Sequence, residues 1–312
     1  MKKRLVWFLL MIAILGAVFS LSSCVNTLSE GEIHIVATHF AGYDLAAEVV
    51  GRDNTRVSVE FLSAGDSHSF NPTFGDIAKI ENADLFIYVG GESDSAIDAL
   101  LKNVGDVNCL KMIDCVPLLE AEDRHEHEEG EEHHEHPYDE HVWTSPYHAA
   151  EITEAICEAI SAIDPDYAGD YRQNADRCKE ALLSLDRDFE ELFALYENPT
   201  LVFGDRFPFL YFAHRYGVSY HAAFPGCSSA SEPSPHTVIE LVDMVKKEKI
   251  STVFHIESGT HEVAEHIASE GGAKTALLHS CHKVSPDEIK AGTTYLSLMR
   301  DNYLAIKKAL EK

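Results

Sequence analysis

Short apolar runs alternate with stretches of helical apolar spacing from residue 33 onward. In the first half of the chain, runs of strand length predict strands at Ile33–Thr38, Val57–Leu62 and Leu85–Val89. Tyr43–Val50 and Phe74–Asn82, which lie between them, have the apolar spacing of helices. Strands separated by helices indicate βαβ units, in which neighbouring strands are parallel.

The same alternation resumes after Asn198 and Pro199 and predicts a second sheet. The apolar runs again have strand length, and the stretches between them again have helical spacing. The expected strands are Leu201–Phe203, Val218–Ala222, Thr252–His255 and Thr275–Leu278, and the expected helices are Phe209–Tyr216, His236–Lys247, His261–Ser269 and Tyr295–Leu310.

Two longer helical stretches, at about 146–162 and 166–196, lie between these halves. The second is amphipathic and has no neighbouring strand in sequence, so we interpret it as a bridge. The predicted fold is α/β, with two lobes of parallel sheets flanked by helices and joined by one long rigid helix. The expected organisation is a signal peptide at 1–23, a first lobe at 24–162, a linking helix at 163–197 and a second lobe at 198–312.

The first 23 residues have the pattern of an export signal. A basic start at Lys2, Lys3 and Arg4 precedes the apolar run Leu5–Leu21. The sequence Leu-Ser-Ser-Cys that ends at Cys24 resembles a bacterial lipobox, which predicts a lipid on Cys24. The alternative is an uncleaved membrane anchor, although the run is at the short limit for a spanning helix. Both place the rest of the chain on the outer face of the bacterial cytoplasmic membrane.

Charge and histidine content favour a cation as the ligand. The chain has 52 acidic and 25 basic residues, a net charge of −27, and the mature chain is near −30. Nucleic acid is excluded as a partner because phosphate contacts need clustered Lys and Arg. Eighteen histidines indicate a transition metal. Residues 121–140 hold ten acids and five of these histidines, namely His125, His127, His133, His134 and His136.

Six cysteines follow Cys24, and export to an oxidising compartment would permit disulfides among them. Six cysteines allow 15 pairings. We favour Cys227 with Cys281, because both follow predicted strands in short loops, and Cys109 with Cys115 is a local option.

Several histidines follow predicted strands. His39, His68 and His279 come after strand ends, and His255 lies at the end of another. The binding crevice of an open parallel sheet lies beyond the carboxyl ends of its strands, and a neutral imidazole there is a natural metal ligand. The spacing therefore predicts a metal site at the sheet edges.

Motifs in both halves resemble one family, the metal-binding solute-binding lipoproteins of ABC-type zinc and manganese importers. The resemblance covers about residues 33–305. It implies two α/β lobes on a rigid helix, one divalent cation between them, delivery to ABC permease subunits, and no enzymatic activity. We also expect a monomer. The motifs are His34–Asp44, Gly65–Thr73, Asn82–Gly91, Asp139–Pro146 and Ser231–Pro235.

Taken residue by residue, the resemblance implies a ligand set. His68 and His141 stand where the family has its first two histidines. The second half departs from the family: Asp205 stands near the usual third histidine, and His279 stands at the end of the last strand, where an Asp is common. The implied set is therefore His68, His141, Asp205 and His279. Outer partners could be His255, His282 and Glu257.

Three imidazoles and one carboxylate favour tetrahedral zinc over manganese, which prefers more oxygen ligands. The histidine-rich segment is interpreted as a low-affinity zinc trap, with a purely solubilising linker as the alternative.

Three other functions remain open from the sequence. One is a manganese or iron carrier of the same family. Another is a surface metal buffer or adhesin without a permease. A zinc hydrolase is disfavoured, because the nearest string to His-Glu-x-x-His, His261–His266, has its histidines five apart.

Overall fold

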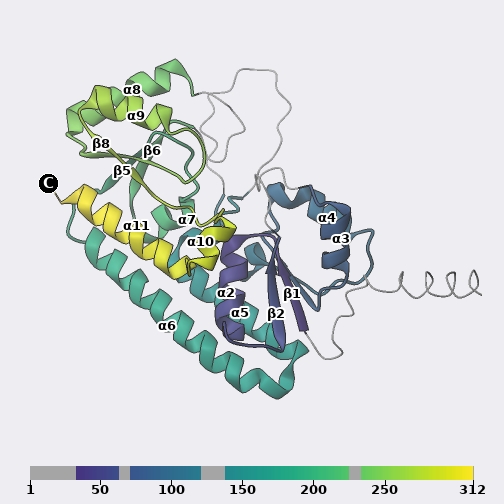
Figure 1. Cartoon of the computed structure of the whole chain (residues 1–312). Coiled ribbons are helices and arrows are strands. Elements are labelled where there is room, and N and C mark those ends of the chain that lie inside the picture. Colours follow the sequence, from purple (N-terminus) through teal and green to yellow (C-terminus); the bar gives the residue numbers. More distant parts are fainter. Residues whose placement is uncertain (1–32, 63–70, 121–137, 225–232, 312) are drawn as a thin grey trace, which may run out of the picture. The chain divides into compact units, whose positions relative to one another are not determined.

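The computed structural model describes residues 33–62, 71–120, 138–224 and 233–311 (Figure 1). The residues from His34 onward belong to one compact unit. Some residues singled out in the sequence lie outside the described ranges. These are Cys24, His68, the five histidines of segment 121–137, and Cys227.

The first half contains a four-stranded sheet in the order β2-β1-β3-β4. The β1–β3 and β3–β4 pairs are parallel, with Val36 opposite Phe86 and Ile87 opposite Leu110. The strands are β1 (Ile33–Ala37), β2 (Val57–Phe61), β3 (Leu85–Tyr88) and β4 (Cys109–Lys111), and the helices are α2 (Phe40–Val50), α3 (Phe74–Glu81) and α4 (Ser95–Leu101).

The second half repeats this order as β6-β5-β7-β8, with all three neighbouring pairs parallel. Its strands are β5 (Thr200–Phe203), β6 (Ser219–Ala222), β7 (Thr252–His255) and β8 (Lys274–Leu277), and its helices are α7 (Leu210–Tyr216), α8 (Pro235–Glu248), α9 (Glu262–Gly271), α10 (Pro286–Lys290) and α11 (Tyr295–Leu310).

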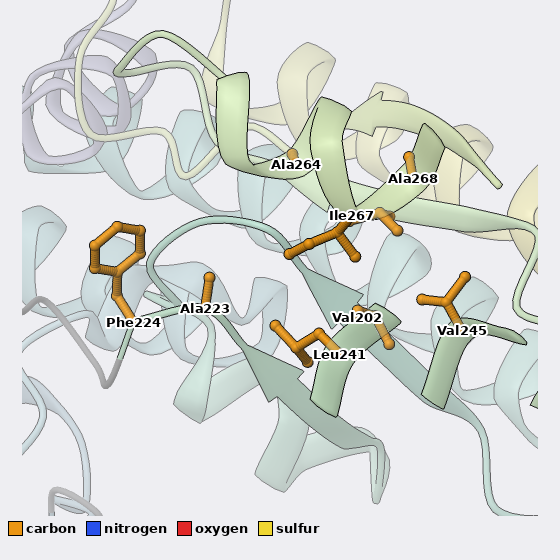
Figure 2. Packing of buried hydrophobic residues seen from close by; sticks show 9 residues of the cluster. Val202, Ala223, Phe224, Leu241, Val245, Ala264, Ile267 and Ala268 are labelled. Atoms are coloured by element: carbon orange, nitrogen blue, oxygen red, sulfur yellow. The ribbon is translucent and has the colours of Figure 1, made fainter. Parts of the chain in front are cut away.

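Apolar side chains from helices and strands form the core of the second half. Val202 and Val253 on the central strands are fully buried. Leu241 and Val245 from α8 and Ile267 from α9 pack with them (Figure 2). Burying one such side chain contributes about 1.5–3 kcal/mol, so this cluster fixes α8 and α9 against β5 and β7.

Two long helices lie between the two sheets in sequence. They are α5 (Pro146–Ile163) and α6 (Ala168–Phe193). The long helix α6 contacts α2 and α5 of the first half as well as α7 and α11 of the second (Figure 1). The predicted fold class, two parallel sheets flanked by helices with one long helix, is confirmed.

Differences from the predicted elements have local causes. The helix α2 begins at Phe40, three residues before the expected start, because the His39 side chain accepts a hydrogen bond from Ala41 N and caps it. The strand β4 was not predicted, because it has three residues and only Leu110 in it is buried. The helices α4 and α10 are short and were also not predicted.

Within the described ranges, no helix has both the length and the apolar content needed to cross a membrane.

Candidate metal centre

A small cavity lies at the carboxyl ends of strands of the first sheet and is closed by a loop from the second half. Its volume is about 20 Å³, room for one water molecule or one ion. The first half contributes Thr38 and His39 after β1, Val89, Ser93 and Asp94 after β3, and Glu140 and Trp143; the second half contributes His282.

Two carboxylates lie on the first-half side of this cavity. Glu140 accepts hydrogen bonds from the Ser93 backbone N–H, at 3.1 Å, and from the Ser93 hydroxyl. Burial raises the pKa of Asp94 to about 6, and the neighbouring charge of Glu140 adds to this. Gly91 is required beside them, because a Cβ at this position would collide with the Glu140 side chain.

His141 is positioned to act as a metal ligand. Its side chain is 2% exposed, and its backbone N–H donates to Asp139 Oδ1 at 2.8 Å. The same carboxylate oxygen lies 3.1 Å from His141 Nδ1. A carboxylate at this distance favours a proton on Nδ1, which places the lone pair of the neutral ring on Nε2. This carboxylate–histidine pairing is the one that orients zinc-binding imidazoles in proteins.

His282 brings a second imidazole to His141 from the loop after β8. The two ring centres are 6.0 Å apart. Two imidazoles bound to one zinc at about 2.0–2.1 Å in tetrahedral geometry have ring centres roughly 5 Å apart, about 1 Å less than the separation of these two rings. The His282 ring also lies 5.4 Å from the Trp143 ring, centre to centre.

His39 lines the cavity, and its Nδ1 accepts a hydrogen bond, unlike Nδ1 of His141, which faces a carboxylate. Its Nδ1 accepts from Ala41 N at 3.1 Å, so the proton of the neutral ring is on Nε2. Its ring centre lies 3.8 Å from that of Trp143 and 4.7 Å from that of His282. His39 therefore caps α2 and packs against the site.

His279, a predicted ligand, is 7% exposed, and both its ring and its backbone form hydrogen bonds. Its Nδ1 accepts from Cys281 N at 2.9 Å, which again puts the ring proton on Nε2. Its backbone N–H donates to Asn302 Oδ1, and its carbonyl accepts from Asn302 Nδ2. In this state the ring offers no free nitrogen lone pair to a metal.

Asp205, the other predicted ligand of the second half, follows β5 and is 7% exposed. Its Oδ1 accepts from Arg206 N at 2.8 Å, and its Oδ2 accepts from Ile256 N at 3.3 Å. Gly204 allows this close packing, because a Cβ there would collide with Ala264 of α9. Both carboxylate oxygens therefore accept hydrogen bonds from nearby backbone.

The predicted outer partners lie after β7. Glu257 binds the loop that carries His282, through Ser280 N, Ser280 Oγ and His282 N. The ring of His255 lies 3.1 Å from Ile256 O through Nδ1, and its centre is 4.0 Å from that of His261.

The expected disulfides are not present among the described cysteines. Cys281 is fully buried with a free thiol, which lies 3.8 Å from His279 O, and its expected partner Cys227 is outside the described residues. Cys109 and Cys115 are also free. Burial raises the pKa of the Cys281 thiol, which favours the neutral form.

Across the described ranges, no group of three or more His, Cys, Asp or Glu side chains is arranged to hold a metal ion. The structure brings together His141 and His282, whereas His68 lies outside it. Sequence analysis placed His282 only among outer partners. Its position three residues after His279 is the sequence feature that points to His282. The hydrogen bonds that distinguish the two histidines depend on the three-dimensional structure.

Comparison with known proteins identifies the family. The model of the ZnuA family, described as the periplasmic component A of a zinc-uptake complex, matches residues 35–309. The chain belongs to the ZnuA family. This is a family of solute-binding proteins and not of enzymes, which removes the hydrolase alternative.

Individual ZnuA-family proteins are similar over most of this chain. It is 30% identical to the zinc-binding lipoprotein AdcA of Streptococcus pneumoniae, over 97% of this chain and 61% of AdcA. The chain thus spans about three fifths of the length of that relative. It is 30% identical to the high-affinity zinc uptake system protein ZnuA of Bacillus subtilis, over 95% of this chain and 96% of that protein.

A solved structure supports the same assignment. The Zn(II)-bound ZnuA-like domain of Streptococcus pneumoniae AdcA superposes with a TM-score of 0.73 at 29% identity. The match covers 90% of this chain and all of that domain.

Proposed function

We propose that this chain binds one zinc ion between its two halves, outside the cytoplasmic membrane, and delivers it to an ABC-type permease. The observation that carries this is His141, whose Nδ1 faces a carboxylate and whose ring lies 6.0 Å from that of His282, which lines a cavity the size of one ion. Family membership and the zinc-binding names of the relatives support the choice of cargo.

The proposed ligands are His141, His282 and His68. We propose His282 in place of His279, because the one lone pair of His279 Nδ1 already accepts a backbone N–H, and in place of Asp205, whose two oxygens are held by the backbone N–H groups of Arg206 and Ile256. His68 follows β2, the strand next to β1 in the first sheet, and is the third ligand in this proposal. A set of imidazoles favours zinc over manganese.

The ion keeps its oxidation state in this function, and only its ligands change. Neutral imidazoles exchange for the water ligands of the ion, and protons compete with zinc for the same nitrogens. Asp139 stabilises the ligating tautomer of His141. Trp143 and His39 cover the site with ring surface and limit access of water.

The remaining parts of the proposal concern location and partners. We propose that a lipid on Cys24 tethers the chain, that segment 121–137 concentrates zinc through its histidines, and that the chain acts as a monomer on the permease.

The test is the zinc content of the mature chain in which the five histidines of segment 121–137 are changed to Ser, after zinc loading and exhaustive dialysis. We expect one zinc per chain, lost in His141→Ala and kept in His236→Ala, whose side chain is 81% exposed. If the chain with Ser at these five positions and with His141 intact retains no zinc, the histidines of segment 121–137 are the zinc ligands. Retention of one zinc after the His141 change would contradict the proposed site.

A further inference from the structure

The loop that carries His282 contains a backbone conformation that is unfavourable for its residue. Cys281 has φ +58°, in the left-handed region. A residue with a Cβ held there costs about 1–3 kcal/mol and persists only where the surroundings hold it. Such a turn brings successive backbone N–H groups to one side of the loop.

Glu257 receives those N–H groups. Its Oε2 accepts from Ser280 N at 2.8 Å. Its Oε1 accepts from Ser280 Oγ at 2.6 Å and from His282 N at 3.3 Å, and Lys283 N lies 3.5 Å from the same oxygen. The Glu257 side chain is 12% exposed, so these bonds are shielded from water. Both carboxylate oxygens therefore accept hydrogen bonds from the loop.

The first half holds the same loop from the opposite side. Trp143 Nε1 donates to Ser280 O at 2.8 Å, and Trp143 O accepts from the Tyr295 hydroxyl at 2.5 Å. Ser280 is therefore bound through its N–H and hydroxyl to Glu257 and through its carbonyl to Trp143. The position of the His282 ring depends on these bonds, because His282 is two residues along the same turn.

We infer that Glu257 is a positioning residue for zinc binding: it holds the strained turn at Cys281 so that the His282 imidazole faces His141. This inference rests on the proposed function. The change Glu257→Gln replaces one of the two acceptor oxygens by an NH2 group that faces the N–H groups of the turn, so the turn relaxes and His282 moves away from the ion. Changes in the partners that orient a metal ligand typically weaken metal binding 10- to 100-fold.

A double-mutant cycle tests the inference in the mature chain with the five histidines of segment 121–137 changed to Ser. Zinc affinity is measured by competition with a chromophoric chelator in the parent, Glu257→Gln, His282→Ala and the double variant. We expect Glu257→Gln to weaken zinc binding about 10- to 100-fold in the parent and less than about threefold in His282→Ala. Cobalt(II) absorption in the same variants reports the number of ligands.

A second, milder variant tests the inference if Glu257→Gln does not fold. Ser280→Ala removes one hydrogen bond to Glu257 and keeps the charge, so we expect a smaller loss that also disappears in His282→Ala. Circular dichroism of the metal-free variants shows whether each is folded.

The outcomes are distinguishable. An equal loss of zinc affinity in the parent and in His282→Ala would show that Glu257 supports the fold in general. No loss of affinity in the parent would show that the turn keeps its conformation without Glu257. Either result overturns this inference and leaves the proposed function standing. If His282→Ala itself leaves zinc affinity unchanged, the proposed site and the inference both fail.

Discussion

The two halves of the molecule share one strand order but hold the residues of the candidate site differently. In the first half, Asp139 Oδ1 accepts from His141 N and lies 3.1 Å from His141 Nδ1, which favours a proton on Nδ1 of the buried imidazole. In the second half, His279 and Asp205 lie at equivalent strand ends, and both accept hydrogen bonds from their own loops. His282, one turn further along, is the imidazole that reaches His141.

The difference shows that a place at the carboxyl edge of a sheet is not enough to make a ligand. An imidazole nitrogen has one lone pair, so a nitrogen that already accepts a backbone N–H must lose that bond before it binds a metal, and a buried N–H left without a partner costs about 1–3 kcal/mol. In the proposed site, the first half therefore contributes His141 beside the Asp139 carboxylate, and the second half contributes His282 on a turn held by Glu257.

The largest expected effect comes from removing one ligand of either half. His141→Ala and His282→Ala should each weaken zinc binding about 100-fold or more, because structural zinc sites hold roughly 10–16 kcal/mol over four ligands, or about 3 kcal/mol per ligand. Competition with a chromophoric chelator measures this. A loss below threefold in His282→Ala would mean that the second half does not supply this ligand.

The contact between the halves should respond to acid through His148. Burial, and the nearby Arg215 and His214 of α7, lower the pKa of His148 to about 4. A depressed histidine pKa contributes stability that is present above about pH 6.5 and lost as pH falls toward 4. Between pH 7 and 4.5, the metal-free protein should therefore lose roughly 2–3 kcal/mol more unfolding free energy than His148→Gln.

Urea unfolding at the two pH values provides the measurement. The raised pKa of Asp94, about 6, changes the unfolding free energy in the opposite direction in this pH range, because the stability that it contributes is lost as pH rises. It is present in both proteins and cancels in the comparison. Equal pH dependence in the two proteins would contradict a neutral, buried His148.

The carboxylate that orients the first-half ligand should have the next largest effect. Asp139→Ala should weaken zinc binding about 10- to 100-fold, because His141 loses the partner that favours a proton on Nδ1. Asp139→Asn keeps an acceptor oxygen and should lose less. Isothermal titration calorimetry gives both values, and full affinity in Asp139→Ala would remove the orienting role.

The smallest effect on zinc is expected at the two predicted ligands that bind their own loops. His279→Asn and Asp205→Asn should each change zinc affinity less than threefold and lower the unfolding free energy by about 1–3 kcal/mol. Chelator competition and urea unfolding of the same preparations separate the two quantities. If either variant weakens zinc binding as much as His282→Ala, the ion lies deeper in the second half, as the sequence motifs implied.

Much of the fold was predictable because buried parallel strands are short apolar runs. Thr252–His255 was predicted without error, and β1 and β8 within one residue at each end. The start of α2 at His39 was not predictable from apolar spacing, because it depends on one side-chain hydrogen bond.

The site was less predictable than the fold. His141 follows from motif resemblance, and its carboxylate partner is two residues away in sequence. His282 and His279 have the same side chain, and hydrogen bonds of the turn between them give the two rings different positions. Those bonds join Ser280 to Glu257, 23 residues away in sequence, and to Trp143, 137 residues away. No local pattern encodes those contacts.

The most direct test of the account is a crystal structure of the zinc-loaded chain with anomalous diffraction recorded at the zinc edge. The account predicts one anomalous peak about 2.0–2.1 Å from His141 Nε2 and from a ring nitrogen of His282, with His279 Nδ1 still accepting from Cys281 N. A peak bound to Asp205 and His279, with His282 turned away, would contradict it.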